Sequence, residues 1–147
     1  MINNNAKKWL RALRSGSYTQ GAGGLHSIDQ EGTSTFCCLG VACNLYLKGN
    51  DIQTRGGRPD YAKRQPVAYG DEYSYLPTQV ADWLGLKSIK GTFVGGDPHQ
   101  GIFGSLVELN DNGASFREIA DVIEEREESL FHQPQVKWES RSSSGGE

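Results

Sequence analysis

The chain has 147 residues, of which 36% are hydrophobic and 22% are charged. This length predicts one domain with one core, and this composition excludes a fully disordered chain and a membrane protein. No run approaches the roughly 18 apolar residues that cross a bilayer, so we expect no membrane partner. Glycine is frequent, at 19 residues, which predicts many turns or close backbone contacts.

The net charge of −3 conceals an uneven distribution along the chain. Residues 1–70 contain nine bases and four acids, whereas residues 71–147 contain six bases and fourteen acids, so the two halves carry +5 and −8. This asymmetry predicts a dipolar molecule if the halves face apart. The acidic balance argues against a general nucleic-acid-binding protein, but it allows a local basic pocket for a small anion.

The three cysteines, Cys37, Cys38 and Cys43, are too few and too clustered for a disulfide framework. We expect reduced thiols in an intracellular protein. The cysteines and histidines lack the paired spacing of metal ligands, so no metal is expected. The glycine-rich loop at residues 20–24 matches neither a P-loop nor a dinucleotide fingerprint, so no cofactor is expected either.

The first predicted element is a helix whose apolar face contains Ala6, Trp9, Leu10 and Leu13. These positions follow helical spacing, and Gly16 is a typical helix stop. A loop with three glycines in four positions then leads to two β-rich segments.

Segments 25–28 and 33–37 predict a β-hairpin, because a glycine-containing connector separates them. The chain then runs without a linker into a helix predicted over residues 38–47. Further strands are predicted at residues 66–69, 73–76 and 92–94. A short helix is predicted after Pro77, ending at Gly85.

Ser115 and Glu118 form a capping-box pattern, which predicts a helix that runs to about Glu128. Residues 1–132 are therefore predicted to form a single α+β domain, with a small antiparallel sheet or hairpins packed with about four short helices. Residues 133–147 lose the periodicity and are predicted to be a mobile tail.

The junction between the hairpin and the second helix is the main candidate site. The free N–H groups and the dipole of a helix N-terminus favour negative charge, and the glycine-rich loop can present further N–H groups to an anion. A nearby arginine suits phosphate, and a tyrosine can stack on a base. The residues of this predicted site are Arg14, Tyr18, Gln20, Gly21, Gly23, Cys38, Asn110 and Asp111.

Other interpretations of the same residues stay open. Cys38 at a helix N-terminus, with His26 as its base, would make a cysteine-dependent transferase or hydrolase. Alternatively, the cysteines are small core residues and the turn at 110–113 is only a turn. A third hypothesis is an inhibitor that docks on a host protein through an aromatic and acidic surface.

Several segments resemble a largely uncharacterised group of small bacteriophage-encoded proteins with a Cys-Cys-Leu-Gly-Val core. The segments are Trp9–Gly16, Tyr18–Gly23, Phe36–Cys43, Tyr75–Pro77, Trp83–Leu86, Leu109–Asp111 and Ile119–Glu124. The resemblance covers residues 8–128 in patches and transfers no catalytic residues. It implies an accessory protein of the host cytoplasm that binds a host protein or sequesters a nucleotide-like, phosphate-bearing signal of host defence. Small sequestering proteins often place their sites between subunits, so we expect a homo-oligomer.

Overall fold

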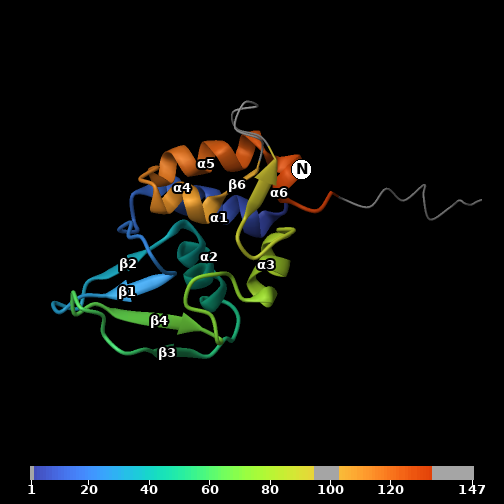
Figure 1. Ribbon diagram of the computed structural model, residues 1–147. Coiled ribbons are helices and arrows are strands. Elements are labelled where there is room, and N and C mark those ends of the chain that lie inside the picture. The colour runs from blue at the N-terminus through green and yellow to red at the C-terminus, as the bar shows by residue number, and fades with distance from the viewer. Residues whose placement is uncertain (1, 95–102, 134–147) are drawn as a thin grey trace, which may run out of the picture.

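The computed structural model describes residues 2–94 and 103–133, and in this part the chain is α+β, as predicted. A sheet forms one end of the molecule and most helices lie at the other (Figure 1). The elements are α1 (Asn4–Ser15), β1 (His26–Ile28), β2 (Ser34–Phe36), α2 (Cys38–Leu47), β3 (Thr54–Gly56), β4 (Gln65–Tyr69), α3 (Thr78–Leu84), β5 (Thr92–Val94), β6 (Phe103–Ser105), α4 (Leu106–Asp111), α5 (Phe116–Glu125) and α6 (Glu127–Leu130). The predicted tail lies, from residue 134 on, outside the described residues.

Helix α1 confirms the first predicted helix. The Asn3 side chain accepts a hydrogen bond from the Ala6 N–H and caps the first turn. Gly16 ends the helix with φ of 77°, a left-handed conformation that glycine adopts without strain. The buried face consists of the four residues that the spacing predicted, which are Ala6, Trp9, Leu10 and Leu13.

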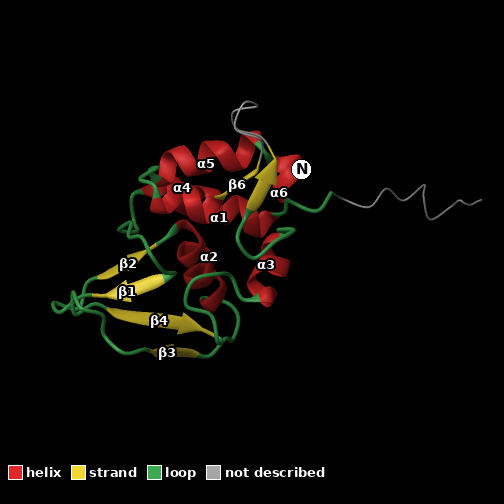
Figure 2. Ribbon diagram, viewed as in Figure 1, coloured by secondary structure: helices red, strands yellow, loops and turns green. Residues whose placement is uncertain are grey.

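The main sheet has the strand order β2-β1-β4-β3, with antiparallel neighbours (Figure 2). Strands β1 and β2 confirm the predicted hairpin, and the Asp29 carboxylate accepts hydrogen bonds from two N–H groups in its turn. Strand β3 was not predicted, because its three residues are all exposed and show no alternation. The strand predicted at residues 73–76 is wrong. That segment is irregular, and its Tyr73 carbonyl accepts a hydrogen bond from Leu25.

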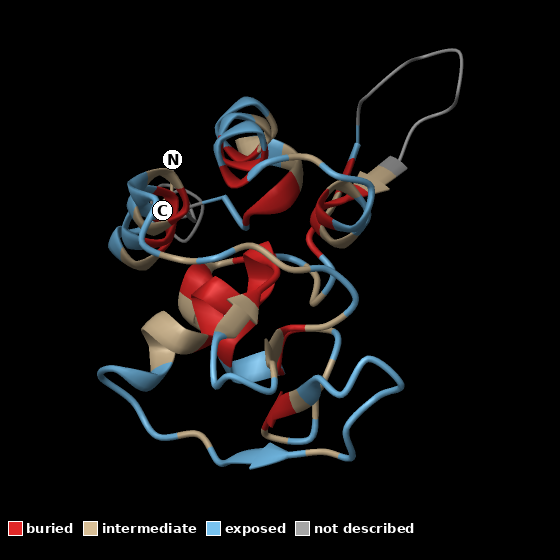
Figure 3. Ribbon diagram, turned by 90° about the vertical axis from the view of Figure 1, so that its left-hand side faces the viewer, coloured by how far each residue is buried: buried red, intermediate tan, exposed pale blue. Residues whose placement is uncertain are grey.

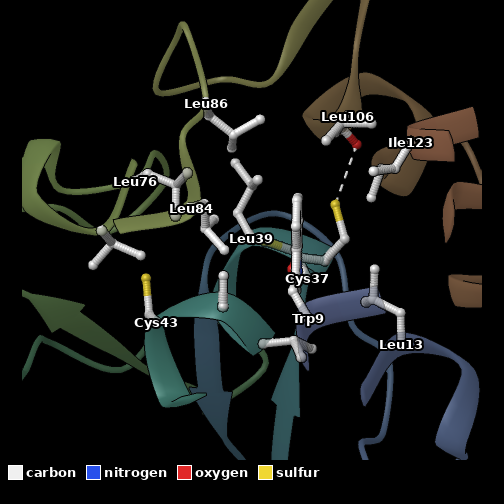
Figure 4. Packing of buried hydrophobic residues seen from close by; sticks show 14 of the residues in the cluster. Trp9, Leu13, Cys37, Leu39, Cys43, Leu76, Leu84, Leu86, Leu106 and Ile123 are labelled. Carbon is white, nitrogen blue, oxygen red and sulfur yellow. Dashed lines mark hydrogen bonds between the residues drawn. The ribbon is translucent and has the colours of Figure 1, made fainter. Parts of the chain in front are cut away.

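Helix α2 lies in the interior, between the sheet and the other helices. Its residues from Cys38 to Cys43 are all buried, and it packs against α1, α3, α4 and β2. Buried segments gather in this region in Figure 3, and side chains from several helices meet there in Figure 4. A helix that is apolar on every side must be covered on every side.

Gly40 allows α2 to approach the start of β1. The Leu25 carbonyl oxygen accepts a hydrogen bond from the Cys37 N–H at 3.1 Å, which holds β1 against the first turn of α2. A Cβ atom on residue 40 would overlap this oxygen. The position therefore requires glycine because of close backbone contact, although its φ is an ordinary helical one.

The second half of the chain differs from the prediction at two helices. Helix α3 follows Pro77 and ends at Gly85, and the capping box of Ser115 and Glu118 is present at α5, as predicted. However, the last predicted helix is interrupted at Arg126, where α5 ends and the short α6 begins. Helix α4 was not predicted, because its Asn-Asp end is typical of a turn. Among the described helices, none has the length and apolarity to span a bilayer.

We predict that Gly40→Ala destabilises the fold by about 3 kcal/mol or more, because the methyl group would force β1 away from α2. Urea unfolding measures this change. Gly49→Ala is the matched control, since a Cβ atom there meets open space. Equal midpoints for the two variants would contradict the close approach.

Candidate functional site

The structure brings together six of the eight residues that were predicted to bind a ligand. These are Gln20, Gly21, Gly23, Cys38, Asn110 and Asp111. They meet where the glycine-rich loop, the start of α2 and the end of α4 converge, so the predicted proximity of loop and helix is present. The side chains at 110 and 111 come from α4, which the sequence did not reveal as a helix.

Asn110 lies at the centre of this junction and is only 3% exposed. Its Oδ1 accepts hydrogen bonds from Gln20 Nε2 at 2.8 Å and from the Cys38 N–H at 3.1 Å. Its Nδ2 donates to the Gly21 carbonyl at 2.7 Å. One buried amide thus joins three segments that are far apart in the chain.

Two further N–H groups of the junction have acceptors within the chain. The Asp111 carboxylate accepts from the Gly23 N–H at 3.1 Å, and the Cys37 sulfur accepts from the Gly40 N–H at 3.4 Å. The N–H groups of Cys38, Gly40 and Gly23, which were expected to face an anion, therefore already have acceptors. The described contacts make the junction a structural joint, and ligand binding by these residues stays a prediction.

Arg14 lies away from the junction, contrary to the prediction. Its guanidinium donates to Asp121 at 2.8 Å and to Glu124 at 2.7 Å, both on α5. These hydrogen bonds raise the pKa of Arg14. The physical reason is that α1 packs along α5, so this side of α1 faces acidic residues rather than the loop.

Tyr18 is half-buried rather than free to stack on a ligand. Its hydroxyl donates to Asn44 Oδ1 at 2.7 Å, and its ring meets the Phe36 ring edge to face, with centroids 5.1 Å apart. Its ring thus packs within the protein.

We predict that Asn110→Ala lowers the free energy of unfolding by about 2–3 kcal/mol, because it leaves buried donors and an acceptor without partners. Chemical denaturation measures the loss. Asn112→Ala, at an exposed position on the same turn, is the control and should change stability by less than about 0.5 kcal/mol. Similar losses in both variants would show that Asn110 has no joining role.

The structure contradicts Cys38 as an activated nucleophile. The residue is fully buried, and its thiol donates to the Leu106 carbonyl at 3.5 Å. Burial raises the pKa of the Cys38 thiol well above its usual value, and it raises the pKa of Cys37 to about 11. Loss of hydration outweighs the helix N-terminus here, so the neutral thiols pack as small core residues.

His26 is likewise engaged within the sheet. Its Nδ1 lies 2.9 Å from the Tyr69 hydroxyl and its Nε2 lies 2.8 Å from Ser34 Oγ. The ring stacks on Phe36 with centroids 4.2 Å apart, and burial lowers the pKa of the imidazole. Both ring nitrogens therefore have partners other than Cys38, and the predicted Cys–His pair is wrong.

We predict that the three thiols of the native protein react with a disulfide reagent at pH 7.5 at least ~100-fold more slowly than in denaturant, because only thiolates that reach solvent react. Absorbance of the released thiolate measures the rates. Rapid modification of Cys38 in the folded protein would restore the enzyme hypothesis.

A groove lies on the outer side of α1, where this helix meets α5 and α6. Its volume is about 970 Å³, and its lining residues are Ile2, Lys7, Leu10, Arg11, Arg14, Ser15, Glu124 and Glu127. Lys7 and Arg11 are exposed, and neither forms an ion pair with the residues that the structure describes. Together with Arg14 they follow spacings of four and three, so the three cations share one face of α1.

The sequence contained a signal for this groove, although it was not interpreted as a site. The charged residues of α1 alternate with its apolar face, and this pattern fixes which side is basic. Helix α5, which is far along the chain, packs against α1 and forms another wall of the groove. Within residues 2–94 and 103–133, no group of three histidine, cysteine or acidic side chains is placed to hold a metal ion.

A family model described as "Domain of unknown function (DUF8296)" matches residues 1–127. The chain belongs to this family. The match includes α1 to α5, so the DUF8296 region contains both the buried junction and all the groove residues. No curated protein and no solved structure matches the chain.

Proposed function

We propose that this DUF8296 chain is a binding protein that holds a small anionic molecule with an apolar or aromatic body in the groove beside α1. The observation that carries the proposal is the pair Lys7 and Arg11. Both side chains are exposed without an ion-pair partner in the described structure, and they border a hollow of about 970 Å³. This volume is at the upper end of the range for small-molecule sites.

The lining of the groove indicates the chemistry of the ligand. Half-buried Ile2, with the small exposed part of Leu10, provides an apolar surface, and Lys7 and Arg11 provide charge for a phosphate or carboxylate. Glu124 and Glu127 also line the groove, and Glu124 is paired with Arg14. Arg14 is bound to α5, so it fixes the two helices relative to each other instead of meeting the ligand. A nucleotide-like molecule fits this description, because its base is flat and apolar and its phosphate is anionic.

Two considerations favour sequestration over catalysis. The buried thiols and the engaged His26 leave the cysteine mechanism without a nucleophile or base. The resemblance to small phage proteins supports a role in the host cytoplasm, where an accessory protein would withdraw a nucleotide-like signal of defence. This placement is part of the proposal and rests on resemblance.

The first test uses 8-anilinonaphthalene-1-sulfonate as a probe, because it combines an aromatic body with one anionic group. We predict that Lys7→Glu/Arg11→Glu weakens its binding at least ~10-fold, a change of about 1.4 kcal/mol. Fluorescence titration measures the affinity. The control is Lys8→Glu/Lys48→Glu, which makes the same charge change at exposed positions outside the groove.

Mass spectrometry of small molecules released from the purified protein then identifies the natural ligand class. An anionic compound that is retained by the wild type and by the control, but not by the groove variant, supports the proposal. Equal probe affinity in all three proteins would refute the groove as the site.

A further inference from the structure

The loop between β3 and β4, residues 57–64, presents an aromatic side chain to solvent. We call this loop the hairpin tip. Tyr61 within it is 98% exposed. Asp60 holds the turn, because its carbonyl accepts from the Lys63 N–H at 2.8 Å and its carboxylate accepts from the Arg64 N–H at 2.9 Å. A ring on an ordered turn loses little conformational freedom when it binds a partner.

The hairpin tip is also basic. It contains three bases and one acid. Arg64 forms an ion pair with Asp60 at 3.3 Å, whereas Arg58 and Lys63 are exposed and form no ion pair in the described part of the chain. The tip therefore offers one apolar ring between two available positive charges.

A second surface has the complementary character. We call it the α6 hollow, a depression of about 450 Å³ lined by Val94, Glu124, Glu125, Arg126, Glu127, Glu128, Ser129 and Gln133. Val94 is 56% exposed there and provides an apolar surface. Glu124 of this lining is already paired with Arg14, and Lys87 Nζ donates to the Glu128 carbonyl at 3.1 Å. The carboxylates of Glu125 and Glu128 are exposed at the edge of the hollow and form no ion pair with the residues that the structure describes.

The two surfaces lie at opposite ends of the molecule, so they cannot meet within one chain. The β3–β4 hairpin is at the sheet end, and α6 is at the helical end (Figure 1). The view in Figure 3 shows the same separation of sheet and helices.

We infer that the hairpin tip of one copy docks into the α6 hollow of a second copy. Tyr61 would cover Val94, and Arg58 and Lys63 would face Glu125 and Glu128. A second copy is favoured over other occupants because this chain carries both complementary surfaces, each with one of its few exposed large hydrophobic side chains. The net charge of −3 disfavours nucleic acid as the partner.

This contact joins different surfaces on the two copies, so it is heterologous. Repetition of such a contact produces a closed ring or an open chain of subunits rather than a two-fold dimer. The contact is small and charged. The fraction of associated subunits should therefore rise with protein concentration, and the affinity should fall as salt screens the charges. It does not involve Lys7 or Arg11, so it stands independently of the anion site.

Sedimentation velocity tests the inference with two complementary variants of the full chain. The tip variant is Arg58→Glu/Tyr61→Ser, and the hollow variant is Glu125→Lys/Glu128→Lys. All four positions are exposed, so both variants should fold. Circular dichroism checks that they do. We predict that the wild type self-associates at low salt and dissociates at about 0.5 M salt. Each variant alone should be monomeric. An equimolar mixture should form heterodimers and nothing larger, because it retains one intact tip and one intact hollow per pair.

Two control variants change charge elsewhere on the surface. Lys8→Glu is matched to the tip variant, and Asp51→Lys/Asp82→Lys to the hollow variant; both should associate like the wild type. Three outcomes would overturn the inference. The first is that the wild type stays monomeric at about 0.5 mM protein and low salt. The second is that either variant still self-associates alone, as a two-fold contact would allow. The third is that the tip binds single-stranded nucleic acid while the protein stays monomeric.

Discussion

The burial of the first half of α2, from Cys38 to Cys43, is the constraint on which the rest of the structure depends. The helix follows β2 directly and is apolar on every side in its first half, so other elements must cover each of its faces. Its first N–H groups are thereby removed from water, and each needs an acceptor from the protein. Asn110 and the Cys37 sulfur supply acceptors, and the Trp9 indole donates to the Cys38 carbonyl at 2.9 Å.

The same burial decides what the helix N-terminus can do. An exposed helix start attracts anions and lowers the pKa of a thiol, and this was the basis for expecting a site at Cys38. In the folded protein the desolvation of the sulfur is the larger effect, so the pKa of the thiol rises. The Asn110 side-chain amide accepts the hydrogen bond of the Cys38 N–H, and the junction joins three segments of the chain.

Because the interior side chains are packed against one another, the charged groups that can meet a ligand lie on the surface. The basic face of α1 borders a groove that α5 closes on one side, and the ion pairs of Arg14 with Asp121 and Glu124 hold these helices together. The hairpin tip and the α6 hollow lie farther apart, at the two ends of the molecule. Recognition by this protein would thus depend on where its charges are placed, since the three thiols are buried and the His26 imidazole is hydrogen-bonded within the fold.

The sequence by itself determined the elements whose signals are local. The spacing of Trp9 and Leu13 predicted the buried face of α1, the glycine-containing connector predicted the β1–β2 hairpin, and Ser115 with Glu118 predicted the start of α5. Each of these signals acts through hydrogen bonds or side-chain contacts within a few residues, so a short stretch of the sequence is enough to predict the element.

Only the tertiary structure decided how those elements meet. Asn110 joins Gln20 across 90 positions, and Arg14 meets Glu124 across 110. The burial of Cys38 likewise depends on α4, which is separated from it by a long stretch of chain. Hydrogen bonding, desolvation and ion pairing between distant residues depend on distances that only packing sets, and these distances determine which polar groups remain available to a ligand.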